Sequence, residues 1–383
     1  MLKPNYNITI LEKSTKLLSK VKVSGGGRCN VTNHCFDNSE LIKNYPRGNK
    51  ELNQVFSKFN VQHTINWFKQ NGIVLKTEDD NRMFPDSNSS QTIIDCFMDL
   101  SKKLNISIHL NSEVLSILSK QNTFNIITNQ KNYSANAIIC AIGGHNKTNA
   151  YNIIKQLGHS IIEPIPSLFT FNLPNESIKK NLQGLSVRNA QIKIAQSKLQ
   201  FNGPVLITHW GLSGPAVLKL SAFAATDFFK QNYFSDISVN WVYPLKPSEI
   251  ELIIKQFQKN KHKALPYSQS MFGLPKRLWE FLCMKSDIMN TKPWSEVNNK
   301  QINKLVQNLC NNVLKMEGKT TFKEEFVSCG GVSLKEINFK TMESKLIPNL
   351  FFCGEVLNID GITGGFNFQS AWSTAWMCAE NIN

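Results

Sequence analysis

The chain has 383 residues, and 43 Lys and Arg against 28 Asp and Glu give it a net charge of +15. With 41% hydrophobic and 19% charged residues it has the composition of a folded globular protein, which excludes a wholly disordered chain. No apolar run reaches the roughly 18 residues of a membrane helix, and the first residues show no secretory signal. We therefore expect a cytoplasmic protein of two or three domains with no membrane partner.

The nine cysteines are scattered along the chain, and none forms a Cys-x-x-Cys pair. This spacing excludes a thioredoxin-type dithiol and a ribbon-type zinc site, so we predict reduced thiols and no metal. The basic residues include short clusters at 259–263 and 275–277. Two interpretations of this charge stay open, a generally solvated basic surface and a face that binds a polyanion.

The first 160 residues alternate between strand and helix patterns. Apolar runs at 7–11, 106–110 and 137–142 predict strands, and 114–118 with 124–128 predict a β-ribbon. Helical spacing of apolar residues appears at Val61, Ile65 and Phe68, and again from Ile93 to Leu104. This order predicts an α/β domain with a largely parallel sheet.

The pattern of predicted strands and helices changes near residue 165. Strand signals dominate 165–245, and helical patterns dominate 246–321. From residue 322 the chain returns to α/β character, with a buried strand at 350–353 and a helix from about Asn367. We therefore predict a discontinuous domain of residues 1–164 and 322–383, interrupted by an inserted substrate domain at 165–321.

Three glycine-rich segments stand at the ends of predicted elements, where backbone N–H groups can approach phosphate or a heteroaromatic ring. The first, residues 24–33, contains Gly25, Gly26 and Gly27 and then Arg28, whose charge suits a pyrophosphate. The second, residues 141–144, follows a buried strand. Each segment also has a plainer interpretation as a surface turn.

The third glycine segment, residues 353–369, is the most informative. Glu355 and Asp360 follow a strand, and a Thr-Gly-Gly turn opens a helix. These carboxylates can accept hydrogen bonds from ribityl or ribose hydroxyls, and the helix N-terminus favours the anionic edge of a reduced flavin. Glu12, at the end of a strand, is a candidate for binding adenosine ribose hydroxyls.

Together with the motifs at 79–85, 208–216 and 341–345, these segments resemble the aminoacetone-oxidase-like NAD(P)/FAD-dependent oxidoreductases, the BaiN-type flavoproteins. The resemblance spans nearly the whole chain. It implies a glutathione-reductase-like, Rossmann-type FAD-binding domain with an inserted β-barrel-like and helical domain. It also implies FAD as cofactor and NAD(P)H as a possible electron donor. Some members are thought to reduce a uridine of large-subunit rRNA to dihydrouridine.

Carried over by position, the resemblance implies a set of residues along FAD. The set is Glu12, Lys13, Gly25, Gly26, Gly27, Arg28, Cys29, Asn30, Thr32, Val114, Ala141, Gly143, Gly354, Glu355, Asp360, Gly361, Gly364, Gly365, Phe366, Asn367, Phe368 and Gln369.

The sequence departs from the family pattern before Glu12. The family places a strand and a Gly-x-Gly-x-x-Gly turn about 20 residues before the acidic residue, whereas 11 residues without glycine precede Glu12 here. We therefore expect the sequence to lack the roughly 20–25 residues of a strand, turn and helix, and to bind FAD weakly or not at all. The stretch after Gly144 is also less glycine-rich than in many relatives.

Three residues are candidates for catalysis, each with a structural alternative. His209 could donate a proton or be a satisfied structural histidine. Arg82 could clamp a substrate phosphate or pair with a neighbouring aspartate. Cys29 could act as an acid near a flavin or pack as a small buried side chain.

Three functional hypotheses follow. The first is an FAD-dependent oxidoreductase that transfers hydride between reduced flavin and an unsaturated or amine-type small molecule. The second is an RNA-modifying flavoenzyme that forms dihydrouridine in rRNA and holds phosphates with the basic 255–285 region. The third is a cofactor-less remnant that binds a partner.

Overall fold

The computed structural model describes residues 6–120, 123–145, 148–320 and 327–382. The chain divides into two compact units, which we call unit 1 (residues 1–167 and 322–383) and unit 2 (residues 168–321). Unit 1 extends three residues past the predicted boundary at 164 because strand β10 (Ile161–Ser167) pairs with β18 (Val327–Val332). No described helix has the length and apolar content needed to cross a membrane.

Unit 1 contains the α/β elements that the sequence predicts. Strand β1 (Thr9–Leu11) pairs in parallel with β5 (Ser107–His109), and β9 (Ile138–Cys140) pairs in parallel with β21 (Leu350–Phe352). The C-terminal strand thus pairs within unit 1, as predicted. The other ladders of unit 1 are antiparallel. In one sheet β4 (Arg82–Pro85) lies between β2 (Thr32–Asn33) and β3 (Leu75–Thr77), and in another β7 (Thr123–Thr128) lies between β6 (Val114–Lys120) and β8 (Asn132–Ala135). Strand β20 (Glu343–Ser344) lies between β19 (Ile337–Asn338) and β21.

The parallel strands do not form one sheet in the described residues. The pair β1–β5 and the sheet β19–β20–β21–β9 are separate, so the largely parallel sheet that we predicted is divided. Strand residues Ile10 and Ile139 are each 39% exposed, and Ile142 after β9 is 45% exposed. In an α/β sheet, helices ordinarily cover the apolar side chains on both faces of the sheet. These strands therefore lack part of that covering layer.

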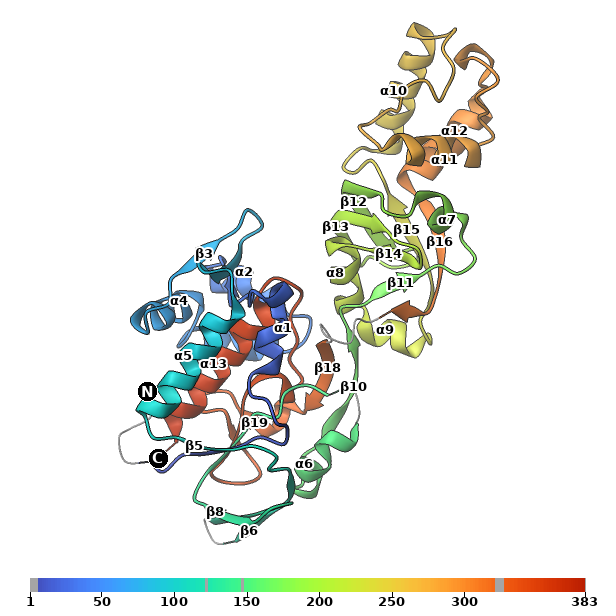
Figure 1. Cartoon of the computed structure of the whole chain (residues 1–383). Helices are drawn as coiled ribbons and strands as arrows, with labels where there is room; N and C mark the ends of the chain where they lie inside the picture. The colour runs from blue at the N-terminus through green and yellow to red at the C-terminus, as the bar shows by residue number, and fades with distance from the viewer. Residues whose placement is uncertain (1–5, 121–122, 146–147, 321–326, 383) are drawn as a thin grey trace. The chain divides into compact units, whose positions relative to one another are not determined.

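Helices of unit 1 pack through aromatic side chains. Helix α5 (Ser90–Lys103) runs alongside α13 (Phe366–Asn381) (Figure 1), and Phe97 of α5 stacks on Trp372 of α13 with 5.6 Å between ring centroids. Phe68 of α4 (Val61–Gln70) contacts the same two rings edge-on. The capping box at Asn60 and His63 begins α4. The remaining helices of unit 1 are α1 (Ser19–Gly27), α2 (Asn38–Ile42), α3 (Asn49–Phe56) and α6 (Asn152–Gln156).

Unit 2 is built on a seven-stranded sheet in the order β16–β15–β12–β13–β14–β11–β17. Its two edge strands, β16 (Asn312–Glu317) and β17 (Lys319–Thr320), are separated only by Gly318, so the sheet curls into a barrel-like form. The inner strands are β11 (Thr170–Asn172), β12 (Ser186–Ile194), β13 (Gln200–Ile207), β14 (Gly211–Ser213) and β15 (Phe234–Asn240).

The helices of unit 2 share one apolar core with this sheet. Helices α10 (Pro247–Asn260), α11 (Lys276–Lys285) and α12 (Asn299–Cys310) form the helical part, which ends at residue 310 because β16 returns to the sheet. The core includes Trp241, Trp279 and Trp294, each at most 1% exposed. The smaller helices are α7 (Ser177–Leu182), α8 (Pro215–Phe223) and α9 (Ala225–Lys230).

Candidate active site

The first glycine segment breaks helix α1 and leaves an open backbone. Ser24 has extended backbone angles, and Gly25, Gly26 and Gly27 follow with φ of 57°, 67° and 82°. A Cβ at Gly25 would lie 2.8 Å from the Asn30 backbone N, so that position requires glycine. Apart from the adjacent backbone of the same segment, no described atom lies within 4 Å of the Cβ position at Gly26 or Gly27. The segment therefore offers bare, exposed backbone that a ligand could approach closely.

Arg28 is held in place rather than free. Its guanidinium donates to the two carboxylate oxygens of Glu78 at 2.5 and 3.5 Å and lies 4.0 Å from the centroid of the Phe84 ring. Glu78 also accepts from Arg82 at 3.4 Å, and Asp80 accepts from Arg82 at 2.7 Å. Glu78 was not among the predicted residues. Its position just before Asp79 and Asp80 is the signal that could have identified it.

The third glycine segment meets the first. Asn33 donates through Nδ2 to the Gly364 carbonyl at 3.0 Å. Gly365 has φ of 92°, and a Cβ there would lie 2.4 Å from the Thr32 carbonyl oxygen, so the two backbones are in direct contact. Asn367 bonds both backbone groups of Gly361, at 2.8 and 2.9 Å, and so fixes the turn before α13.

Several predicted cofactor residues of this region are internal. Gln369 is fully buried and bonds Thr32 at 2.5 Å, and Thr64 and Ser373 at 2.9 Å each. The Phe368 ring stacks on the Trp372 ring with an angle of 9° between the ring planes. Phe366 is buried, and its main-chain carbonyl accepts a hydrogen bond from the Tyr45 hydroxyl. The side chains of Gln369 and Thr32 thus link α13 to neighbouring elements, and their contact with a cofactor stays a prediction.

The second glycine segment lies against Glu355. A Cβ at Gly144 would be 3.5 Å from Glu355 Oε2, and Glu355 pairs with Lys20 at 2.6 Å. Lys20 Nζ is in turn 3.7 Å from the Cβ position of Gly143. Gly354 donates its N–H to Thr374 of α13 at 2.9 Å. The three glycine segments therefore converge, with a partly exposed carboxylate between them. Ala141 lies exposed beside Gly143.

A charged residue just after β1, Lys13, acts on His145 beside the second glycine segment. Burial lowers the pKa of His145, and the positive charges of Lys13 and Lys20 lower it further. Glu12 is half-buried at the end of β1, and its carboxylate accepts from the Ser14 N–H at 2.8 Å. Val114 begins β6 and is half-buried.

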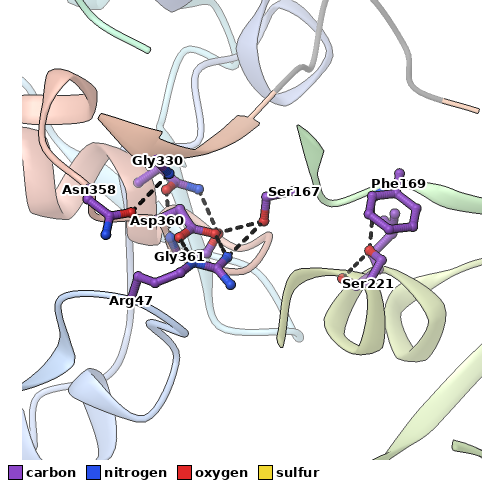
Figure 2. A network of polar contacts seen from close by, with 10 residues as sticks. Arg47, Ser167, Phe169, Ser221, Gly330, Asn358, Asp360 and Gly361 are labelled. Carbon is purple, nitrogen blue, oxygen red and sulfur yellow. Dashed lines mark hydrogen bonds and ion pairs between the residues drawn. The ribbon is translucent and has the colours of Figure 1, made fainter. Parts of the chain in front are cut away.

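Asp360 lies between Arg47 and Ser167 (Figure 2). It is 1% exposed, forms an ion pair with Arg47 through both carboxylate oxygens, and accepts from Ser167 at 2.7 Å. Burial raises the pKa of Asp360, although Arg47 and Ser167 act in the opposite direction. In this structure Asp360 is an internal carboxylate whose partners are Arg47 and Ser167, and its role as an acceptor for cofactor hydroxyls stays a prediction. Arg47 was missed because nothing near it in sequence marks it as a partner.

The candidate catalytic residues fall in different places. Cys29 is fully buried with φ of 60°, and burial raises its thiol pKa to about 11, which favours the packing alternative over an acid. Arg82 is paired with Asp80, which favours the second interpretation of that residue. His209 is exposed in unit 2, and its ring centroid lies 4.3 Å from that of Trp210. Both residues line a cavity of about 370 Å³.

These residues fit one end of an FAD molecule better than the other. For the flavin end, unit 1 supplies open glycine backbone at 26–27, the Glu355 carboxylate and the N-terminus of the 16-residue helix α13. For the adenosine end it supplies Glu12 at the end of β1. The described residues before Glu12, which are 6–11, contain no glycine for a pyrophosphate turn.

The comparisons with known proteins agree with this arrangement. The family described as HI0933-like protein Rossmann domain matches residues 1–381. A ribosomal RNA dihydrouridine synthase of Escherichia coli (strain K12) is 28% identical over 98% of this chain and 92% of its own length. The protein of that name in Haemophilus influenzae is 28% identical over 100% of this chain and 94% of its own. A 3-dehydro-bile acid delta(4,6)-reductase of Clostridium scindens is 24% identical over 97% and 92%.

The match over nearly the full chain confirms the resemblance drawn from the glycine segments. A Rossmann-type α/β unit, converging glycine segments and relatives named as a reductase and as dihydrouridine synthases all point to flavin-dependent redox chemistry. The chain therefore belongs to the HI0933-like FAD Rossmann family and is a flavoprotein oxidoreductase.

Proposed function

We propose that this chain reduces a uridine of large-subunit rRNA to dihydrouridine. The observation that carries the proposal is the end-to-end alignment, at 28% identity, with two proteins named ribosomal RNA dihydrouridine synthase. The overall reaction adds two electrons and two protons across one carbon–carbon double bond of the uracil ring. Reduced FAD, when bound, supplies the hydride for this addition.

The charge of the chain supports an RNA substrate. Unit 2 has 20 Lys and Arg against nine Asp and Glu, so it carries +11 of the chain's +15, whereas unit 1 carries only +4. A genome-wide bias toward lysine would raise the charge of both units. Concentration of positive charge on the inserted unit is what binding to a phosphate backbone requires.

The chain's own residues have defined parts in this proposal. The open backbone of Gly26 and Gly27 admits the cofactor, and Glu355 accepts hydrogen bonds from its ribityl hydroxyls. Lys20 pairs with Glu355 at 2.6 Å and so orients that carboxylate. A uridine reaches a flavin only after it is unstacked, so binding must also hold the RNA strand on either side of it.

The test is rRNA reduction by the full chain. Large-subunit rRNA from a strain lacking its own rRNA dihydrouridine synthase is incubated with the protein, excess FAD and dithionite, and its nucleosides are analysed by mass spectrometry. We expect dihydrouridine with the wild type, much less with Glu355→Gln, and the wild-type amount with the surface control Glu40→Gln. Absence of dihydrouridine while FAD is bound and reduced would overturn the proposal.

A second candidate is reduction of a double bond in a small molecule. It is favoured by the alignment with the bile acid reductase, which covers 97% of this chain. The two candidates differ in their response to salt, because binding to RNA weakens steeply between low and moderate salt and binding to a neutral enone does not. NAD(P)H-driven turnover of a steroid enone that is insensitive to salt, without rRNA reduction, would favour the second candidate.

A further inference from the structure

Unit 2 contains a cavity that the flavin chemistry does not use. It has a volume of about 480 Å³ and is lined by segments 186–189, 241–245 and 272–275. This volume lies within the range of small-molecule sites. All lining residues belong to unit 2, whereas the glycine segments belong to unit 1.

The cavity has an apolar, aromatic floor. Trp241, Val187 and Leu274 are buried, and Tyr243 and Phe272 are half-buried. The Trp241 indole Nε1 is buried without a hydrogen-bond partner among the described residues.

Polar side chains reach the rim through an irregularity in β12. The register of β12 against β13 shifts between Val187 and Ala190. The two residues in between, Arg188 and Asn189, are exposed and line the cavity. Bulges of this kind re-aim side chains and are frequent beside binding sites. Arg188 provides a fixed cation, and Asn189 provides an amide that both donates and accepts hydrogen bonds.

Further cations adjoin the lining segments in sequence. Lys246 follows Leu245, and Lys276 and Arg277 follow Pro275, and all three are exposed. The Arg277 guanidinium donates to the Asn181 carbonyl at 2.6 Å, and Lys276 lies 3.9 Å from Glu280. The cavity therefore lies in the more basic unit of the chain and has cations at the ends of two of its three segments.

We propose that this cavity holds an unstacked base of single-stranded RNA. The inference rests on the proposed rRNA function and assigns the cavity to a nucleotide that anchors the strand. Tyr243 and Phe272 offer aromatic faces for stacking, Asn189 pairs with a base edge, and Arg188 contacts a phosphate. Aromatic faces beside cations are the general design of sites for single-stranded nucleic acid, whereas a site for a small carboxylate needs no stacking face.

The experiment measures binding of a fluorescein-labelled oligouridylate to the full chain by fluorescence anisotropy over a series of salt concentrations. Because stacking on one aromatic side chain contributes about 1–3 kcal/mol, we expect Tyr243→Leu and Phe272→Leu each to raise Kd by about fivefold to 150-fold. Tyr243→Phe keeps the ring and should bind within about twofold of wild type. Arg188→Gln should reduce the slope of log K against log salt by about 0.7.

The matched control is Lys198→Gln, an exposed cation of unit 2 in the β12–β13 turn outside the lining segments. It should leave both Kd and the salt slope unchanged. Circular dichroism and thermal melting establish that each variant is folded. Wild-type Kd in folded Tyr243→Leu and Phe272→Leu, or an equal loss in the Lys198 control, would overturn the cavity assignment.

The same variants separate this inference from the proposed function. If the wild type forms dihydrouridine in rRNA and both leucine variants bind and react as well as it does, the cavity assignment fails and the function stands. If the leucine variants lose oligouridylate binding but the wild type forms no dihydrouridine, the cavity is an RNA site and the proposed reaction fails.

Discussion

Lys20 and Glu355 lie 335 positions apart in the sequence and form an ion pair of 2.6 Å. The pair joins helix α1 to the turn after β21, beside the Gly143–Gly144 backbone. Lys20 is 60% exposed and Glu355 is 22% exposed, so their mutual attraction is screened by water and contributes at most about 1 kcal/mol to stability. The position of the carboxylate among three glycine segments is therefore more informative than the strength of the pair.

The first prediction concerns this carboxylate. Glu355→Gln removes a charged acceptor for cofactor hydroxyls, and hydrogen bonds to charged groups contribute about 1.5–3 kcal/mol. We expect the Kd for FAD, measured by quenching of flavin fluorescence, to rise by at least about tenfold. Lys20→Gln should change the free energy of unfolding by less than about 1 kcal/mol. An unchanged Kd in Glu355→Gln would remove Glu355 from the cofactor site.

The second prediction concerns Arg47 and Asp360, whose ion pair is far less exposed. Arg47→Met leaves the Asp360 carboxylate, which is fully buried, without its cation. Breaking a buried pair from one side costs about 3–5 kcal/mol, so we expect a loss of that size in urea unfolding. The double variant Arg47→Met with Asp360→Asn should regain part of it, because no buried charge remains.

The matched control for this prediction is Lys43→Met, which breaks the exposed pair with Glu40. It should alter stability by less than about 1 kcal/mol. If Arg47→Met were no more destabilising than this control, the Arg47–Asp360 pair would have no structural role.

Local sequence patterns predicted the helices and strands well, but they did not predict which distant residues pair with one another. The apolar spacing at Val61, Ile65 and Phe68 predicted α4, and the apolar run at 350–353 predicted β21. Each signal is contained within one element, so its physical cause can be read locally. The return of β16 to the sheet of unit 2 was missed, because its pairing with β15 depends on a strand more than 70 residues earlier.

The same distinction applies to the candidate site. The glycines at 25–27 and 364–365 were identified because positive φ and close approach favour that residue type. Which carboxylate would be exposed could not be read from the sequence. Glu355 and Asp360 are five positions apart in one segment, and only the fold determines that Arg47 and Ser167 enclose Asp360 while Glu355 faces Lys20.

The third prediction concerns pH and His159, which is buried in unit 1. Its ring bonds Glu336 and Ser344 at 3.0 Å each. Burial lowers the pKa of His159, although Glu336 acts against this. Burial tends to raise the pKa of Glu336, but hydrogen bonds from Ser160 and His159 hold the pKa of Glu336 below its ordinary value. A depressed folded-state pKa gives stability that is complete above the unfolded pKa and is lost as the pH falls.

We therefore expect unfolding free energy to decrease as pH falls below about 6.5, the ordinary His value, and further as Glu336 titrates. In His159→Gln the decrease near pH 6 should be smaller than in wild type. His262→Gln, at an exposed position of unit 2, should keep the wild-type pH dependence. Chemical unfolding at several pH values measures this, and an identical pH profile in His159→Gln would assign the effect elsewhere.

The fourth prediction concerns the stabilisation of the protein by FAD. Unit 1 offers open glycine backbone at 26–27, the Glu355 carboxylate and Glu12 at the end of β1 as groups that could hold the cofactor. Because a ligand stabilises a protein by RT ln(1 + [L]/Kd), FAD added in excess should raise the melting temperature of wild type and should raise that of Glu355→Gln less. Thermal melting with and without FAD measures both shifts. An equal shift in wild type and Glu355→Gln would show that this carboxylate does not hold the cofactor.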